Sequence, residues 1–120
     1  MTDSALVGTT SGTVRGTVED GLHVFRGVPY AAPPVGAGRW RAAVPHPAWA
    51  GVRDATRYGP TAPQPWRPDG IPAIGRHGEP PFDEDCLTLN IWTPDVGACG
   101  RPVMLWIPVD LVARADTVIE

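Results

Sequence analysis

Apolar and polar residues alternate most clearly late in the chain. Residues 87–91, Leu-Thr-Leu-Asn-Ile, repeat with a period of two, which is typical of a strand with one face on a core. Residues 103–107, Val-Met-Leu-Trp-Ile, are instead apolar at every position and lie between two prolines. So short an apolar run predicts a strand that is buried on both faces of a larger sheet.

A hairpin is predicted near the start of the chain. Residues 13–18 and 22–26 have the composition of strands, and Asp20 and Gly21 lie between them. Gly21 adopts the positive φ that a tight hairpin turn requires at little cost. Residues 1–11 are small and polar without a period, so we expect a flexible N-terminal segment there.

Proline shapes the middle of the chain. Three prolines in residues 28–36 exclude a helix interior and favour an extended connector. Farther along this path, we expect Trp49 to pack on the sheet as an anchor. Residues 52–56 suit either a strand end or irregular chain. Residues 58–82 contain seven prolines and allow no regular element longer than a turn, so this loop is either functional or disordered.

The pattern changes at residue 108. Asp110 is a typical N-cap residue, and apolar side chains follow it at helical spacing. These are Leu111, Val112, Ala115, Val118 and Ile119. We therefore predict three regions: a flexible segment 1–11, a domain over 12–107, and a divergent tail 108–120 with a short helix.

Composition narrows the class of protein. Fifteen prolines and fourteen glycines among 120 residues indicate many loops, whereas five tryptophans and 42% apolar residues indicate a folded chain. The net charge is −3, and all ten basic residues are scattered arginines, so no surface for nucleic acid is predicted. No apolar run is long enough for a membrane span. We expect a cytoplasmic location.

Few residues suggest metal or cofactor chemistry. Cys86 and Cys99 are the only cysteines, too few for a disulfide framework or a structural zinc site. Adjacent acidic residues at positions 83–85 would face opposite sides of an extended chain, so charge pairing at a strand entry is favoured over metal binding. His23 is interpreted as an ordinary strand histidine, and His46 and His77 as loop histidines. No metal, cofactor-binding or catalytic residue is predicted.

Residues 84–92, Glu-Asp-Cys-Leu-Thr-Leu-Asn-Ile-Trp, resemble the second signature of the type B carboxylesterase and lipase family, which includes the cholinesterases. Residues 27–36, 39–41 and 49–56 agree with this family in order and spacing. The resemblance implies an α/β-hydrolase fold and hydrolysis of carboxylic esters by a serine triad without a cofactor. The predicted fold class is α/β, as an N-terminal fragment with a small leading β-sheet, a proline-rich wrap and the first strands of the central sheet. This chain would be mostly β and loop.

The same resemblance assigns structural roles. It implies that Arg39 pairs with Glu84 and ties the connector to the sheet, the alternative being an exposed arginine. Many members pair a cysteine at the position of Cys86 with one where Ala62 stands here. Cys86 is therefore interpreted as a small buried apolar residue. The 58–82 loop lies near the active-site gorge in the family, but ordinary packing or exposure is favoured for its Trp66 and Phe82.

The catalytic machinery of the family is not evident in this sequence. Where the family has a glycine-rich oxyanion turn after the strand, this chain has Pro108, which lacks an N–H. The only serines, Ser4 and Ser11, lie outside any Gly-x-Ser-x-Gly motif. We therefore expect the chain alone to be inactive, as a truncated, frame-shifted or split gene product. The alternative is a binding or assembly module that complements another hydrolase chain or self-associates through an exposed sheet.

Overall fold

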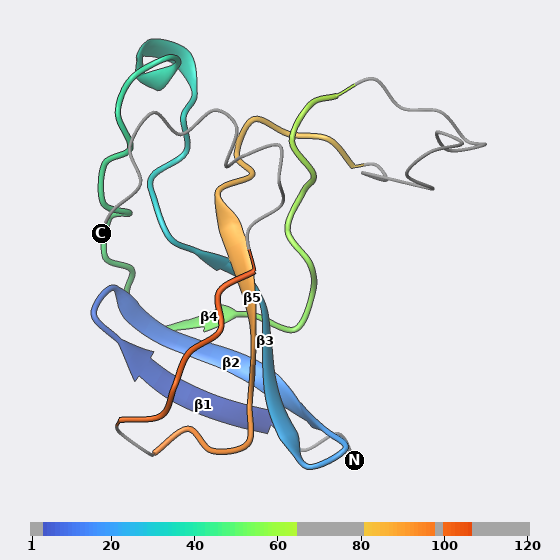
Figure 1. The fold of residues 1–120 in the computed structure, drawn as a ribbon. Helices are drawn as coiled ribbons and strands as arrows, with labels where there is room; N and C mark the ends of the chain where they lie inside the picture. The colour runs from blue at the N-terminus through green and yellow to red at the C-terminus, as the bar shows by residue number, and fades with distance from the viewer. Residues whose placement is uncertain (1–3, 65–80, 98–99, 107–120) are drawn as a thin grey trace, which may run out of the picture.

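The computed structural model describes residues 4–64, 81–97 and 100–106 (Figure 1). The described chain is mostly sheet and loop, and its regular elements are five strands and one 3₁₀ turn: β1 Ser4–Thr9, β2 Gly12–Glu19, β3 Leu22–Pro29, η1 Gly36–Gly38, β4 Val52–Asp54 and β5 Thr88–Thr93. They form one sheet in the order β1-β2-β3-β5, with β4 parallel to β2. Within the described ranges, no helix has the length and apolarity needed to cross a bilayer.

The predicted hairpin is confirmed. β2 and β3 pair antiparallel from Thr17↔Val24 to Glu19↔Leu22. Both residues of the turn have positive φ, 50° at Asp20 and 78° at Gly21. This backbone matches the right-handed twist of the two strands, which is why an Asp-Gly pair is favoured there.

The prediction of a flexible segment over residues 1–11 is wrong at Ser4–Thr9. These residues form β1, which pairs antiparallel with β2 along six positions. Ala5 is buried, whereas Leu6 is 58% exposed. Small and exposed side chains give little periodicity in the sequence, and backbone pairing with β2 supplies the order that the side-chain pattern does not indicate.

A small core lies where the strands and the connector meet. Its buried residues are Ala5, Val14, Phe25, Val28 and Ala55, with Val7, Val18, Trp49 and Leu89 packed against them. The strand predicted around residues 87–91 is confirmed as β5, which begins at Thr88. Its core-facing side is only partly buried, because Leu89 packs on the core while Ile91 remains 40% exposed.

The doubly buried strand predicted for residues 103–107 does not form in the described part, 103–106. Val103 and Met104 are each 88% exposed, and Leu105 and Trp106 are 68% and 84% exposed. A strand buried on both faces needs neighbouring strands and a layer over each face. Among the described residues, the sheet ends at β5 and no helix covers it.

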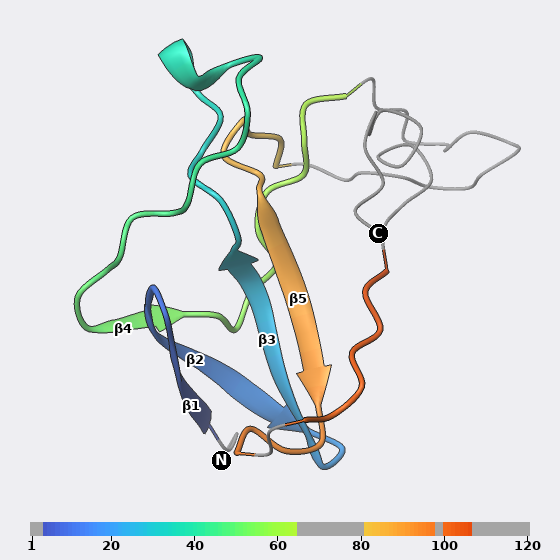
Figure 2. The same ribbon diagram turned by 60° about the vertical axis from the view of Figure 1, so that its left-hand side comes forward.

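The proline-rich connector begins later than predicted. Val28 and Pro29 still belong to β3, so the connector runs from Tyr30 to β4, away from the sheet and back (Figure 2). A backbone hydrogen bond of 2.9 Å from Ala32 N to Val44 O joins its two arms. The tail beyond residue 106, with the predicted helix, lies outside the described residues.

Candidate functional site

Trp49 fastens the connector to the sheet, as the sequence predicted. Its indole N–H donates to the carbonyl oxygen of Thr13 in β2 at 2.9 Å, and its backbone N–H donates to Ser11 O at 2.9 Å. The ring meets His46 edge-on, with centroids 5.6 Å apart, and the guanidinium of Arg53 lies 5.3 Å from the ring centroid. Aromatic packing and a satisfied indole N–H together fix where the connector returns to the sheet.

Arg39 and Glu84 form the contact that the family resemblance implied. Arg39 donates from Nε at 3.0 Å and from Nη2 at 2.5 Å to the same carboxylate oxygen, Oε2. Their side chains are 55% and 39% exposed, so the pair adds at most about 1 kcal/mol. Its role is positional, because it joins the tip of the connector to the entry of β5.

An open groove of about 320 Å³ lies at this ion pair. The residues lining it are Pro34, Arg39, Trp40, Pro63, Glu84 and Cys86. Cys86 is a free, half-buried thiol. Burial raises its pKa, and the carboxylates of Asp85 and Asp83 raise it further. A thiol held in its protonated form is a poor nucleophile. Cys86 is only partly buried, whereas the sequence had suggested a buried apolar residue.

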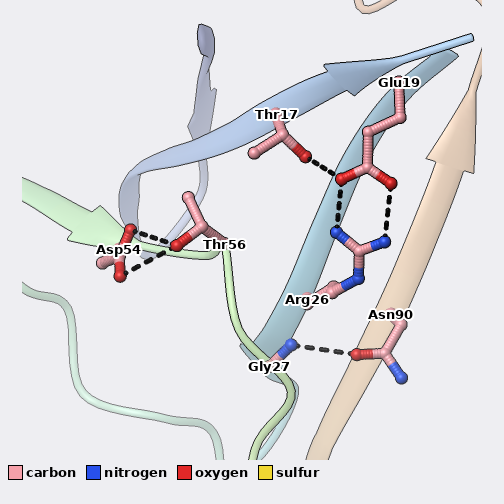
Figure 3. A network of polar contacts seen from close by, with 7 residues as sticks. All are labelled: Thr17, Glu19, Arg26, Gly27, Asp54, Thr56 and Asn90. Carbon is pink, nitrogen blue, oxygen red and sulfur yellow. Dashed lines mark hydrogen bonds and ion pairs between the residues drawn. The ribbon is translucent and has the colours of Figure 1, made fainter. Parts of the chain in front are cut away.

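A charged cluster on the hairpin was not predicted. Glu19 accepts two hydrogen bonds from Arg26, at 2.7 and 2.8 Å, and a third from the Thr17 hydroxyl at 2.6 Å (Figure 3). The guanidinium of Arg26 also lies 5.2 Å from the ring centroid of Tyr58. The cluster could have been predicted from the register of the hairpin. Pairing Glu19 with Leu22 places Thr17, Glu19 and Arg26 on the same face of the sheet.

This cluster perturbs both of its charged members. Hydrogen bonds from Arg26, and then from Thr17, lower the pKa of Glu19 from 4.5 to about 2. The pKa of Arg26 is raised, first by Glu19 and then by Tyr58. The carboxylate and the guanidinium therefore stay charged across the physiological range.

Because of the Glu19 carboxylate, we expect the folded state to lose stability at acidic pH. Its folded pKa lies below the ordinary value, so its contribution is complete above about pH 4.5 and is lost as the pH falls toward 2. Thermal midpoints of the wild type and Glu19→Gln should therefore differ at neutral pH and converge over this window. A midpoint difference that stays constant down to pH 2 would contradict the assignment.

A bulge in β3 is completed by Asn90 of β5. The register shifts between Phe25 and Val28, and Asn90 Oδ1 accepts a 3.0 Å hydrogen bond from the Gly27 N–H (Figure 3). Gly27 has φ 67°, and a Cβ there would lie 2.8 Å from the carbonyl oxygen of Arg57. The bulge thus needs glycine and uses the Asn90 amide to satisfy a backbone donor that the ladder leaves unpaired.

The histidines and serines do not assemble into a nucleophilic site among the described residues. Ser4 is exposed in β1 and Ser11 lies in the turn before β2. His46 Nδ1 lies 2.7 Å from the carbonyl oxygen of Pro47, and the buried Nδ1 of His23 has no hydrogen-bond partner. No hydrogen bond within the described ranges joins a serine to a histidine, and His77 and Trp66 lie outside them.

The acidic residues 83–85, which precede β5, make structural contacts with neighbouring groups. Asp83 Oδ1 accepts a 2.9 Å hydrogen bond from the Asp85 N–H, while Glu84 turns to Arg39. No group of three metal-ligating side chains occurs in the part of the chain that the structure describes. Phe82 is half-buried and forms an isolated bridge with Thr61, which fits ordinary packing.

Comparison with known proteins identifies relatives of this chain. Phenmedipham hydrolase of Pseudarthrobacter oxydans is 66% identical over 99 residues, which cover 82% of this chain and 20% of that protein. Para-nitrobenzyl esterase of Bacillus subtilis (strain 168) is 42% identical over 102 residues, or 85% of this chain and 20% of that protein. The chain thus spans about a fifth of the length of the relatives it matches.

Solved structures agree with the sequence relatives. A PNB esterase superposes with a TM-score of 0.66 at 43% identity, over 85% of this chain and 19% of its own. A carboxylesterase of Geobacillus stearothermophilus gives a TM-score of 0.59 at 39% identity, over 74% of this chain and 16% of its own. The model of the carboxylesterase family matches residues 3–112. The chain therefore belongs to the carboxylesterase family and corresponds to an N-terminal portion of an esterase of the α/β-hydrolase fold.

Proposed function

We propose that this chain supplies the leading sheet and connector of a serine-dependent carboxylic ester hydrolase and does not cleave esters by itself. The observation that carries the proposal is the combination of a family match over residues 3–112 with only two serines, neither in a nucleophile elbow. Two relatives are named for hydrolysis of phenmedipham and for para-nitrobenzyl esters. Carboxylic esters are accordingly the proposed substrate class of the whole hydrolase, with no cofactor.

The chemistry of ester cleavage supports the proposal that this chain alone is inactive. A serine nucleophile needs a base within hydrogen-bond reach and donors aimed at the developing oxyanion. Neither Ser4 nor Ser11 has a histidine partner among the described residues. Loss of one oxyanion donor alone lowers the catalytic rate about 10²–10³-fold. A serine hydroxyl without a base loses most of the remaining rate enhancement.

The described residues instead form a structural scaffold. The connector is held at one end by Trp49 on β2 and at its tip by the contact of Arg39 with Glu84. β3 and β5 are joined through the Gly27 bulge. These contacts fix two chain segments, the connector and the entry of β5, relative to one sheet.

The purified chain is expected to hydrolyse p-nitrophenyl acetate no faster than a Ser4→Ala/Ser11→Ala double variant. Neither serine has an activating base among the described residues, so their removal should change the rate by less than about twofold. A fluorophosphonate probe should likewise leave the chain unlabelled. Serine-dependent turnover together with labelling that the double variant abolishes would overturn the proposal.

A further inference from the structure

The turn between β2 and β3 places an aspartate directly before a glycine. Asp20 and Gly21 lie at the tip of the hairpin (Figure 1), and both are exposed. A side chain on the second residue would hinder the approach of its backbone nitrogen to the aspartate carboxyl group, and glycine has none. Space is available as well, because a Cβ built on Gly21 meets nothing within 4 Å. The Asp20 carboxyl group and the Gly21 nitrogen can therefore meet without a clash.

Both of these groups are also free of other contacts in the described part of the chain. The pairing of Glu19 with Leu22 closes the turn. Among the described residues, no hydrogen bond or ion pair involves the Asp20 carboxylate or the Gly21 N–H. Opening the tip of a hairpin costs less than opening its strands, so the two groups can rearrange while most of the sheet stays paired.

Other aspartates in the described ranges are held in place. Asp54 forms an ion pair with Arg15 at 3.6 Å, and the N–H of Ala55, which follows it, donates to Arg15 O at 2.8 Å. Asp95 accepts a 2.9 Å hydrogen bond from the Gly97 N–H. Neither Asp54 nor Asp95 is followed by glycine. The turn therefore differs from these sites both in its sequence and in its contacts.

We propose that the link between Asp20 and Gly21 is a modification site, at which the aspartate isomerises to isoaspartate. The Gly21 nitrogen forms a bond to Cγ of the protonated Asp20 carboxyl group, and the N–H proton leaves with the carboxyl hydroxyl as water. Water then opens the cyclic imide at the original peptide carbonyl, so the chain continues through Cγ. No atom is gained or lost overall, and no oxidant is consumed. The proposal does not rest on the proposed ester hydrolysis.

The modification would act on the neighbouring charged cluster. Isoaspartate lengthens the backbone of the turn by a methylene group, whereas the length of a tight turn fixes the register of its hairpin. Glu19 precedes the turn and accepts hydrogen bonds from Arg26 at 2.7 and 2.8 Å (Figure 3). We therefore expect isomerisation to disturb the pairing of Glu19 with Leu22 and to release Glu19 from Arg26.

The first test is peptide mapping of the 120-residue chain after several weeks at neutral pH and physiological temperature. Trypsin releases residues 16–26, in which Asp20 is the only aspartate or asparagine. This peptide should acquire a second form with the same mass and a different retention time, and an isoaspartyl methyltransferase should label it. Residues 77–101, whose three aspartates do not precede glycine, should gain at least about tenfold less isoaspartate.

A synthetic peptide of residues 16–26 shows whether the folded turn permits the reaction. The free peptide has no hairpin partner to restrain it, so it serves as the positive control under the same conditions. If the free peptide isomerises and residues 16–26 of the folded chain do not, the turn is protected and the proposal is overturned. Asp69 also precedes a glycine, but trypsin releases it in residues 58–76, so its label is counted separately.

Two variants assign the reaction to Asp20. Asp20→Gly gives a Gly-Gly turn, which accepts positive φ at both positions but has no carboxyl group to cyclise, so its peptide should keep a single form. Asp20→Asn gives the most favoured turn pair and closes the same imide by releasing ammonia. It should convert to aspartate and isoaspartate. A second form in Asp20→Gly, or no conversion of Asp20→Asn, would overturn the proposal.

Thermal unfolding of fresh and aged protein tests the release of Glu19. Ageing should lower the midpoint of the wild type at neutral pH, because the contacts of Glu19 with Arg26 are lost with the register. Glu19→Gln has already lost its ion pair with Arg26, so ageing should lower its midpoint less. An equal fall in both proteins would contradict the release of Glu19 from Arg26.

Discussion

Gly16→Ala is expected to lower the free energy of unfolding by about 3 kcal/mol, at the upper end of the usual cost of overpacking. Gly16 is buried in β2, where a Cβ would collide with the carbonyl oxygen of Val24 and lie 2.7 Å from Cδ1 of the Phe25 ring. A backbone atom of the neighbouring strand cannot rotate away, and the ring belongs to the buried core. Relief therefore requires β2 and β3 to separate.

Gly8→Ala is the matched control for this prediction. Gly8 lies in β1, the strand beside β2, and a Cβ there meets nothing within 4 Å. Alanine reduces the entropy of the unfolded chain, so the change should be neutral or stabilising by about 0.5 kcal/mol. Urea unfolding followed by tryptophan fluorescence compares the two variants. Equal effects would contradict the close approach at Gly16.

Trp49→Ala is expected to cost about 2–3 kcal/mol, less than the removal of a fully buried aromatic side chain because Trp49 is half-buried. The substitution removes packing on the core and the 2.9 Å hydrogen bond to Thr13 O. It also removes the ring that His46 and Arg53 contact. The free energy of unfolding of a domain is typically only about 5–15 kcal/mol. This one substitution should therefore remove a large share of the stability.

Two further variants separate the causes. Trp49→Phe keeps a ring but loses the indole donor, so it should recover most of the packing and leave a deficit of about 1 kcal/mol for the unsatisfied carbonyl. Trp40→Ala is the exposure control, since Trp40 is fully exposed at a strained φ of 59°, and its stability should change by less than about 0.5 kcal/mol. If Trp40→Ala were as damaging as Trp49→Ala, Trp49 would not be the anchor.

Local signals in the sequence predicted the elements that depend on few residues. Asp20 and Gly21 specify a tight turn by their own backbone preferences, and the structure has that turn. The family resemblance correctly implied the Arg39 contact with Glu84, although the two residues are 45 positions apart. Trp49 was identified as an anchor because a large aromatic residue in a proline-rich connector needs a surface to pack on.

The incorrect predictions concern segments whose state depends on neighbours. Ser4–Thr9 has no period of its own and becomes β1 because β2 provides six paired positions. Residues 103–106 have the pattern of a buried strand but are exposed, because the described sheet offers no strand or layer to cover them. The Glu19 cluster was missed because opposite charges are brought together by hairpin register rather than by spacing along the chain.

The sequence by itself determined the family, the hairpin and the need for glycine in the hairpin turn, since turn chemistry and motif order are properties of short stretches of chain. Only the tertiary structure decided that residues 4–9 join the sheet, that Asn90 satisfies the Gly27 donor, and that residues 103–106 are exposed within the described part of the chain. Those outcomes depend on strand pairing and burial between distant segments, and the free energy of such contacts exists only once the partners are in place.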